Sequence, residues 1–334
     1  MYKWLFSPTL GGEKPNSYER ETAAVESSRR TLSFASISGR KVEADFDGGT
    51  TTSDAGALLR RQAESNIGII DRVVAAMSDR RHPSYVDHTY TDLIRQRVFQ
   101  IACGYEDAND SNDLRSDPGF KAACGRLPLS GADLASQPTM SRLENSVSRT
   151  DLYRIGLALL EGFIESYDQP PKKIILDIDD TDDITHGAQQ LSLFNAYHDE
   201  YCYLPVHLYE GTTGKRITTI LRPGCRMRGA QAAAILKRVL DPFLHSDRTS
   251  CHRFAANQFR LFLHSVAYVL LHAIKHRGLR GTQWARANFD TIQLRFLKIG
   301  ARVREQATKV RFHLPTSYPL KDLLRTIVRN LDTT

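Results

Sequence analysis

Residues 174–187 read Ile-Ile-Leu-Asp-Ile-Asp-Asp-Thr-Asp-Asp-Ile-Thr-His-Gly, an apolar run followed by five carboxylates within seven residues. The alternation through Ile178 predicts a β-strand over residues 173–179, with Asp177 and Asp179 on the same face. Adjacent carboxylates repel each other, and a divalent cation removes that repulsion. Hard oxygen ligands suit Mg²⁺ or Mn²⁺, so the stretch predicts a metal site for phosphoryl-transfer chemistry. The alternative is a solvated acidic turn, because charge clusters usually lie on protein surfaces.

The composition is that of an ordinary globular protein. The 334 residues are 41% hydrophobic and 25% charged, which is enough for two or three domains and a sizeable core. No apolar run approaches the length of a membrane span, so we expect no membrane partner and a cytoplasmic protein. The cysteines are scattered without metal-type spacing, as expected for reduced cytosolic thiols: Cys103, Cys124, Cys202, Cys225 and Cys251.

The two parts of the chain carry opposite charge. Residues 211–334 contain 23 Lys or Arg against 6 Asp or Glu, whereas residues 1–210 contain 22 against 32. A strongly basic back part beside a predicted carboxylate metal site indicates a polyanion partner, and we expect double-stranded DNA. The alternative is that many of these arginines line ordinary helix surfaces.

The sequence predicts an α+β (α/β) protein with a helical front. Residues 1–41 are polar and without clear periodicity, as in a flexible leader. Residues 42–168 form a mainly helical, DNA-binding region in this prediction. Its helices are expected over 55–79 with a break near Gly68, over 90–103, from Pro118, over 139–147 with Thr139 as the cap, and over 151–167.

The sheet is expected in the remaining region, residues 169–334. Strands are predicted over 173–179, 201–209 and 216–221, with a turn at 211–214 between the last two. Helices follow over 229–240 and 252–276, and the chain ends in a basic helical part that includes residues 321–331. Three antiparallel strands with carboxylates on the first, followed by a helix, are similar to the opening of a ribonuclease-H-like domain.

Candidate DNA contacts come from two regions. Arg142 follows a Ser136-Gln-Pro lead-in like that of a DNA-reading helix, although a surface arginine on a structural helix is equally consistent. In the basic end, cations interleave with apolar residues, which predicts one buried face and one basic face. The members of this second set are Arg295, Lys298, Arg302, Arg304, Lys309 and Arg311.

Several segments in order resemble the DDE transposases of bacterial insertion sequences, specifically the insertion-sequence thirteen-eighty family. The resemblance runs from about Val42 to the C-terminus. The matching segments are Asp45–Gly49, Thr52–Gly56, Gly104–Asp110, Ser136–Thr139, Ser141–Asn145, Leu176–Asp183, Thr185–Gly187, Phe194–Asp199, Tyr201–Pro205, Asp247–Leu261 and Phe289–Val303.

The resemblance implies a ribonuclease-H-like mixed sheet and metal-dependent DNA cleavage and strand transfer. Asp179 would be the first catalytic and metal-binding aspartate, with Asp177 as the second choice, and the cofactor would be Mg²⁺ or Mn²⁺. The partner would be the terminal inverted repeats of the element, with a nucleoid-associated location, and the resemblance allows a homodimer.

The chain departs from the family in one place. The family carries a second aspartate in a strand–turn of the form Arg-Gly-Asp-Ser-Gly-Phe and then a glutamate on a later helix. Neither has a counterpart between Arg222 and Asp247, so the domain is expected to be truncated between about 240 and 247 and its sheet edge to be unpaired. Asp241 and Asp247 are the only carboxylates near this junction.

Three functions remain open from the sequence. The first is a transposase that is defective because it lacks the second Asp and the Glu. The second is a non-catalytic DNA-binding remnant that regulates full-length copies. The third is a phosphatase of the haloacid-dehalogenase type, because Asp177-Ile-Asp-Asp-Thr181 fits its Asp-x-Asp-x-Thr pattern; that class needs a doubly wound sheet.

Overall fold

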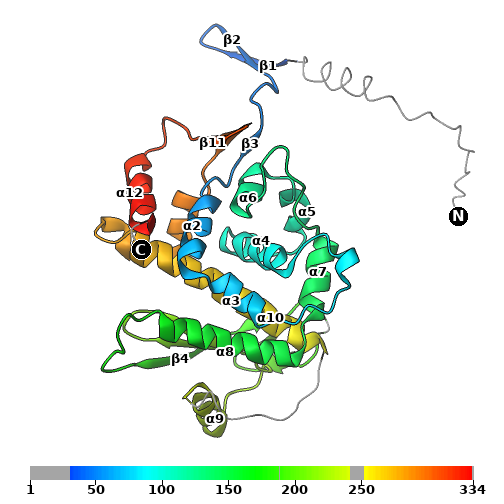
Figure 1. The fold of residues 1–334 in the computed structure, drawn as a ribbon, viewed down its shortest axis with the longest axis vertical. Helices are drawn as coiled ribbons and strands as arrows, with labels where there is room; N and C mark the ends of the chain where they lie inside the picture. Colours follow the sequence, from blue (N-terminus) through cyan, green and yellow to red (C-terminus); the bar gives the residue numbers. More distant parts are fainter. Residues whose placement is uncertain (1–30, 188, 241–251, 333–334) are drawn as a thin grey trace, which may run out of the picture. The chain divides into compact units, whose positions relative to one another are not determined.

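The structure, a computed structural model, describes residues 31–187, 189–240 and 252–332 (Figure 1). The chain divides into two compact units, residues 1–51 and 52–334, which are described separately below. The described elements combine helices with several small antiparallel sheets, as expected for the α+β class. The short strand β3 (Thr51–Thr52) lies at the boundary between the units.

The described part of the first unit contains a β-hairpin of β1 (Leu32–Ile37) and β2 (Arg40–Ala44). Ser38 and Gly39 join the strands with φ values of 51° and 74°, and two consecutive positive φ angles match the right-handed twist of a two-residue hairpin. We expected residues 1–41 to lack regular structure. The difference arises because the hairpin depends on its turn, not on a strong apolar alternation. Residues 1–30 of that expected leader lie outside the described residues.

The second unit begins with the helical region that the sequence predicts. Its helices are α2 (Ala57–Ile67), α3 (Ile69–Ala75), η1 (Pro83–Tyr85), α4 (Tyr90–Ala102), α5 (Asp110–Leu114), α6 (Pro118–Ala123), α7 (Gln137–Ser146) and α8 (Arg149–Glu165). The break at Gly68 is confirmed, since this residue has a φ of 64° and ends α2. Capping boxes start α4 at Thr89 and α8 at Ser148, which fixes both helix starts.

One large core joins the front and back parts of this unit. It extends from Ala57 in α2 to Leu331 in the last helix, and the long helix α10 (His252–Ala273) contacts α4, α7 and α8. Figure 1 shows the long helix α10 crossing this unit. The expected division after residue 168 therefore does not coincide with a break between compact units, because α10 supplies the apolar face that covers the front helices.

The first sheet has the strand order β4-β8-β9 and only antiparallel pairs. Its strands are β4 (Leu176–Asp180), β8 (Val206–Glu210) and β9 (Arg216–Ile220). Leu160 and Phe163 of α8 pack on Val206 and Leu208 of β8, so α8 covers one face of this sheet (Figure 1). The first and third of the expected strands are present as β4 and β9, although the first one begins at residue 176 and not 173.

A second small sheet has the order β5-β7-β6, also antiparallel. It contains β5 (Asp183–Ile184), β6 (Leu193–Asn195) and β7 (Glu200–Tyr203). The single strand expected over 201–209 was wrong, because the chain divides at Leu204-Pro205 into β7 and β8, which belong to different sheets. Proline has no N–H to donate to a ladder, so it suits the point where the chain changes sheets.

The remaining elements form the basic end. They are α9 (Gly229–Leu240), η2 (Ile274–Gly278), η3 (Gln283–Arg286), α11 (Phe289–Ile292), η4 (Gln293–Leu297), β10 (Ala301–Gln306), β11 (Lys309–His313) and α12 (Lys321–Asp332). The helix predicted over 229–240 is confirmed. The basic C-terminal part was expected to be helical, but it also contains the antiparallel hairpin β10–β11, which belongs to a sheet with the order β11-β10-β3.

Gly56 brings the start of this unit against its basic end. The backbone N–H of Gly56 donates to Leu297 O at 3.2 Å, and that of Ala55 donates to Ile299 O at 3.0 Å. A Cβ added at Gly56 would lie 2.0 Å from Phe296 O, so a side chain cannot fit without moving the backbone. This close approach places residues 54–56 beside 297–299.

Candidate functional site

The two candidate aspartates lie where the strand pattern predicts. Asp177 and Asp179 are exposed on one face of β4, whereas Leu176 and Ile178 are half-buried against the core under α8. Across the pair of strands, Asp177 lies opposite Tyr209 and Asp179 lies opposite His207. The strand therefore presents both carboxylates away from the core, where a cation could reach them.

The strand that carries these carboxylates is an edge strand. In the described sheet, β4 has β8 on one side and no strand on the other. Among the described residues, one edge of this sheet is thus unpaired at the strand that carries the acidic pair, and the expected truncation stays a prediction. The junction at 241–251, with Asp241 and Asp247, lies outside the described residues.

The acidic pair offers oxygen ligands for one hard cation at most. Carboxylate oxygens from Asp177 and Asp179 are suitable ligands for Mg²⁺ or Mn²⁺. Within the described ranges, however, no group of three or more His, Cys, Asp or Glu side chains is arranged to hold a metal ion. A two-ion site, with the ions about 4 Å apart, needs more carboxylates than this strand supplies.

His207 and Arg216 sit beside the acidic pair on the same face of the sheet. Arg216 Nη2 donates to His207 Nδ1, and the Thr219 hydroxyl lies 2.5 Å from the same nitrogen. Burial, and then the charge of Arg216, lowers the pKa of His207 to about 4, so the ring is neutral near pH 7. Neither residue was predicted from the sequence, because only the strand register places His207 opposite Asp179 and Arg216 one strand further on.

The hairpin β10–β11 separates charge from apolar surface. Ala301 and Val303 of β10 are buried, and Phe312 of β11 packs against the same small core. The other face carries Arg302 opposite His313, Arg304 opposite Arg311, and Gln306 opposite Lys309. We call this side of the hairpin the basic ribbon face. Four of the predicted DNA-contacting cations project from it, and all four are exposed: Arg302, Arg304, Lys309 and Arg311.

No carboxylate of the described residues neutralises this basic ribbon face. Glu305, the acid within β10, points to the opposite face and accepts hydrogen bonds from the backbone N–H groups of Leu129 (2.8 Å) and Ser130 (3.2 Å). Among the described residues, none of the four cations forms an ion pair within 4.0 Å. Like charges directly opposite each other destabilise a hairpin, so the face is suited to an anionic partner.

Lys298 and Arg295 differ from the four ribbon cations. Lys298 Nζ lies 2.8 Å from Oδ1 of the fully buried Asp54 and 3.5 Å from the centre of the Tyr105 ring. The Tyr105 hydroxyl also donates to Asp54 Oδ2 at 2.8 Å. Lys298 therefore balances a buried carboxylate, which makes it a poor choice for a phosphate contact. Arg295 is exposed in η4, next to the ribbon in sequence.

Arg142 lies on the exposed face of α7. Its Nη2 donates to the Thr139 hydroxyl at 3.1 Å, one turn earlier in the helix. The predicted cap, Thr139, was wrong: α7 begins at Gln137 with Ser136 as its N-cap, because Pro138 is favourable in the first turn. The buried face of the same helix holds Glu144, which pairs with Arg97 and Arg260.

The comparisons with known proteins assign a family. The family model for the transposase DDE domain, group 1, matches residues 34–243 and 242–334. The chain belongs to this family, so it is a transposase-type protein of the DDE class. No curated protein and no solved structure matches the chain. None of the helices in the described ranges combines the length and apolar character needed to cross a membrane.

Proposed function

We propose that this chain binds duplex DNA at the ends of a bacterial insertion sequence of the thirteen-eighty family, but does not complete cleavage and strand transfer alone. The observation that carries the proposal is the basic ribbon face of β10–β11. Four exposed cations on adjacent strands have no carboxylate partner there among the described residues. Strands of several DNA-binding proteins lie in a groove of duplex DNA, and arginine binds phosphates and guanine edges.

The proposed catalytic defect is supported by the carboxylates and the edge position of β4. A DDE transposase acts through metal ions held by three carboxylates, and in this chain Asp179 and Asp177 are the candidates from the first strand. The edge position of β4 supports the loss of a neighbouring strand that would carry the second aspartate. The family match also comes in two segments that meet at 242–243, where we propose that the element has lost a segment.

The fold proposal is an incomplete ribonuclease-H-like domain. The antiparallel order β4-β8-β9, with acids on the first strand and α9 after the third, supports this architecture. The same antiparallel pairing offers no support to the phosphatase alternative, which needs a doubly wound sheet. Asp177 and Asp179 would hold one Mg²⁺ or Mn²⁺ ion, which on binding would supply Lewis-acid polarisation of a phosphate.

The first experiment measures DNA binding by fluorescence anisotropy, using duplexes that carry the terminal repeats of an intact relative. The affinity should fall steeply with salt, and each phosphate contact should contribute about −0.9 to the log–log slope. A salt-independent affinity, or no binding at low salt, would refute the DNA proposal.

The second experiment tests the catalytic defect. A plasmid carrying the proper element ends is supplied with this chain or with a full-length relative in parallel. We expect the full-length relative to excise and join the element ends, and we expect this chain not to do so. Comparable rates from both proteins would refute the defect, and Asp241 and Asp247 would then be the first residues to mutate.

A second candidate function is regulation of full-length copies. It is favoured by the combination of a complete basic ribbon with an incomplete carboxylate set, since such a protein would occupy element ends without cutting them. Adding this chain to the relative's plasmid assay should then reduce excision in proportion to its concentration, and the ribbon variant Arg304→Gln should reduce it less. No inhibition at saturating chain would argue against this role.

A further inference from the structure

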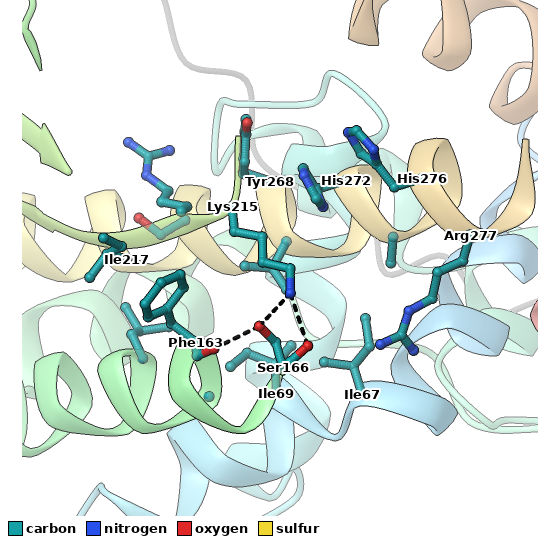
Figure 2. A pocket seen from close by; sticks show the side chains of 16 residues that line it. Ile67, Ile69, Phe163, Ser166, Lys215, Ile217, Tyr268, His272, His276 and Arg277 are labelled. Atoms are coloured by element: carbon teal, nitrogen blue, oxygen red, sulfur yellow. Dashed lines mark hydrogen bonds between the residues drawn. The ribbon is translucent and has the colours of Figure 1, made fainter. Parts of the chain in front are cut away.

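A cavity of about 270 Å³ lies inside the second unit (Figure 2). Neither the acidic pair nor any ribbon cation lines it, although Arg216, which lies two strands from Asp177, does. Its walls come from the ends of α2 and α3, from α8, from the start of β9 and from α10. Apolar side chains line much of it, including Ile69, Leu159, Phe163 and Ile217. At about 30 Å³ for each water-sized group, it has room for roughly nine such groups. That is the size of a small organic molecule.

The polar lining of the cavity is basic. Its titratable lining residues are Lys215, Arg216, Tyr268, His272, His276 and Arg277, and none of the lining residues is an Asp or a Glu. Within the described chain, no carboxylate lies within 4.0 Å of Lys215, Arg216 or Arg277. Glu210 lies on the strand that precedes Lys215. Its Oε2 accepts hydrogen bonds from the Thr213 hydroxyl and backbone N–H, at 2.7 Å each. The lining therefore combines positive charge with apolar walls and contains no carboxylate, although Asp168 and Glu210 are near enough to act on the charge of Lys215.

Lys215 is held so that its ammonium stays in the cavity. Its Nζ donates to Ser166 O and to Ser166 Oγ, each at 2.9 Å, at the C-terminal end of α8. Figure 2 shows this side chain extending between α8 and α10 toward Ser166, with the Arg277 guanidinium on the same side of the cavity as Ile67. Two of the three ammonium donors are thus used for positioning.

Arg216 and Arg277 supply further unbalanced donors. The Nε of Arg216 is buried and has no hydrogen-bond partner in the described residues. Arg277 is exposed, so the cavity opens toward solvent beside it. A buried cation without a counter-charge is costly, and an anionic head placed here would reduce that cost.

The two histidines do not add positive charge at neutral pH. His272 Nε2 lies 2.9 Å from Thr213 O, and its ring stacks on His276 with centroids 4.0 Å apart. Burial lowers the pKa of His272 to about 4, and it also lowers the pKa of His276. The charge that would meet a ligand is therefore that of the lysine and the two arginines.

We propose that this cavity binds an amphipathic organic anion, with a carboxylate head near Lys215 and Arg277 and a short apolar tail among Ile69, Leu159 and Phe163. This proposal does not depend on DNA binding or on the metal. Octanoate, with ten non-hydrogen atoms, is a suitable probe for a cavity of this size. Three matched probes each change one property of octanoate. Octan-1-ol has no charge, octylammonium has the opposite charge, and acetate has no apolar tail.

The test is isothermal titration of the full chain with each probe. We expect one octanoate per chain, bound at least about tenfold more tightly than any of the other three probes. Lys215→Met and Arg277→Met should each lower the binding affinity for octanoate at least about fivefold, because each substitution removes one cation and keeps an apolar side chain. Arg280→Met, which removes an exposed arginine outside the cavity, should leave the affinity unchanged.

Several results would overturn the proposal. One is that octanoate does not bind. Another is that octylammonium, octan-1-ol or acetate binds as tightly as octanoate. A third is that Arg280→Met weakens octanoate binding as much as the two cavity variants do. If Lys215→Met does not fold, Arg277→Met still decides the question, since Arg277 is exposed at the rim. Unchanged octanoate affinity in folded Arg277→Met would also count against the proposed head-group position.

Discussion

Arg304 and Arg311 lie directly opposite each other across the β10–β11 hairpin, on the face that also carries Arg302 and Lys309. Opposed like charges destabilise an antiparallel pair by a few tenths of a kcal/mol to about 1 kcal/mol. The hairpin retains this arrangement because its other face is anchored by the buried side chains of Ala301 and Val303. The ribbon is thus stable enough to present a charge pattern that is unfavourable without an anion.

The first prediction concerns DNA binding by this ribbon. Arg304→Gln should weaken binding to duplex DNA at low salt and reduce the magnitude of the log–log salt slope by about 0.9, because one phosphate contact is lost. Arg280→Gln is the control, since it removes an exposed arginine outside the ribbon. Equal slopes for wild type and Arg304→Gln would exclude Arg304 as a phosphate contact.

The second prediction concerns the free protein. Arg304→Gln should raise the free energy of unfolding by about 0.2–1 kcal/mol in the absence of DNA, because the repulsion with Arg311 is removed. Urea denaturation at low salt measures this change, and the gain should shrink at high salt, where exposed charges are screened. A loss of stability at low salt would show that the opposed arginines are not the dominant interaction.

The third prediction concerns the metal. Mn²⁺ should bind wild type weakly, in the millimolar range expected of two carboxylates, and Asp179→Ala should abolish that binding. Asp180→Ala is the matched control, because Asp180 is adjacent on β4 but points to the opposite face. Paramagnetic broadening in NMR spectra reports the binding. Equal broadening in wild type and Asp179→Ala would exclude Asp179 as a ligand.

The fourth prediction concerns the buried Glu144. This carboxylate lies 3.1 Å from Arg97 Nε and 2.6 Å from Arg260 Nε, and its side chain is fully buried. Glu144→Ala should lower the free energy of unfolding by about 3–5 kcal/mol, because Arg97 stays buried without a counter-charge. Glu165→Ala, which breaks an exposed pair with Arg72, should cost at most about 1 kcal/mol. Similar losses in the two variants would contradict this assignment.

The fifth prediction concerns pH and Glu64. Burial raises the pKa of Glu64 to about 7, although the backbone N–H of Ile70 donates to it at 2.8 Å and opposes the shift. Between its ordinary pKa of 4.5 and about 7, the folded protein holds a proton that the unfolded chain releases, so stability falls as pH rises through this window.

Glu64→Gln should therefore stabilise the protein at pH 8, by on the order of 2 kcal/mol, and have little effect at pH 4. Thermal unfolding at the two pH values measures the difference. Glu161→Gln is the control, because Glu161 is an exposed acid and should show no such pH dependence. A Glu64→Gln effect that does not change with pH would contradict the charge explanation.

Local signals made much of this fold predictable from sequence. The break at Gly68 follows from a glycine in a left-handed conformation, and the helix Gly229–Leu240 follows from its alanine-rich, amphipathic pattern. The same-face placement of Asp177 and Asp179 needed only the two-residue period of a strand. The basic face of β10 was visible in the alternation of Arg302 and Arg304 with apolar residues.

Contacts between distant residues were not predictable in this way. Lys298 was predicted to contact DNA because its sequence neighbours are basic. In the structure it pairs with Asp54, which lies 244 positions earlier and is brought close by the backbone contact of Gly56 with Leu297. The cavity likewise joins Ile69, Lys215 and Arg277, which share no local pattern. Only tertiary packing determines which of many basic residues meets an acid, which meets solvent and which lines a cavity.

The edge position of β4 has a consequence for the behaviour of the protein in solution. A strand with an unpaired side offers backbone N–H and C=O groups to any other extended chain, which makes it a starting point for self-association. Here Asp177, Asp179 and Asp180 are exposed along that strand, and two copies aligned edge to edge would bring their negative charges together. Without a bound cation, the aspartates therefore oppose edge-to-edge pairing of separate copies.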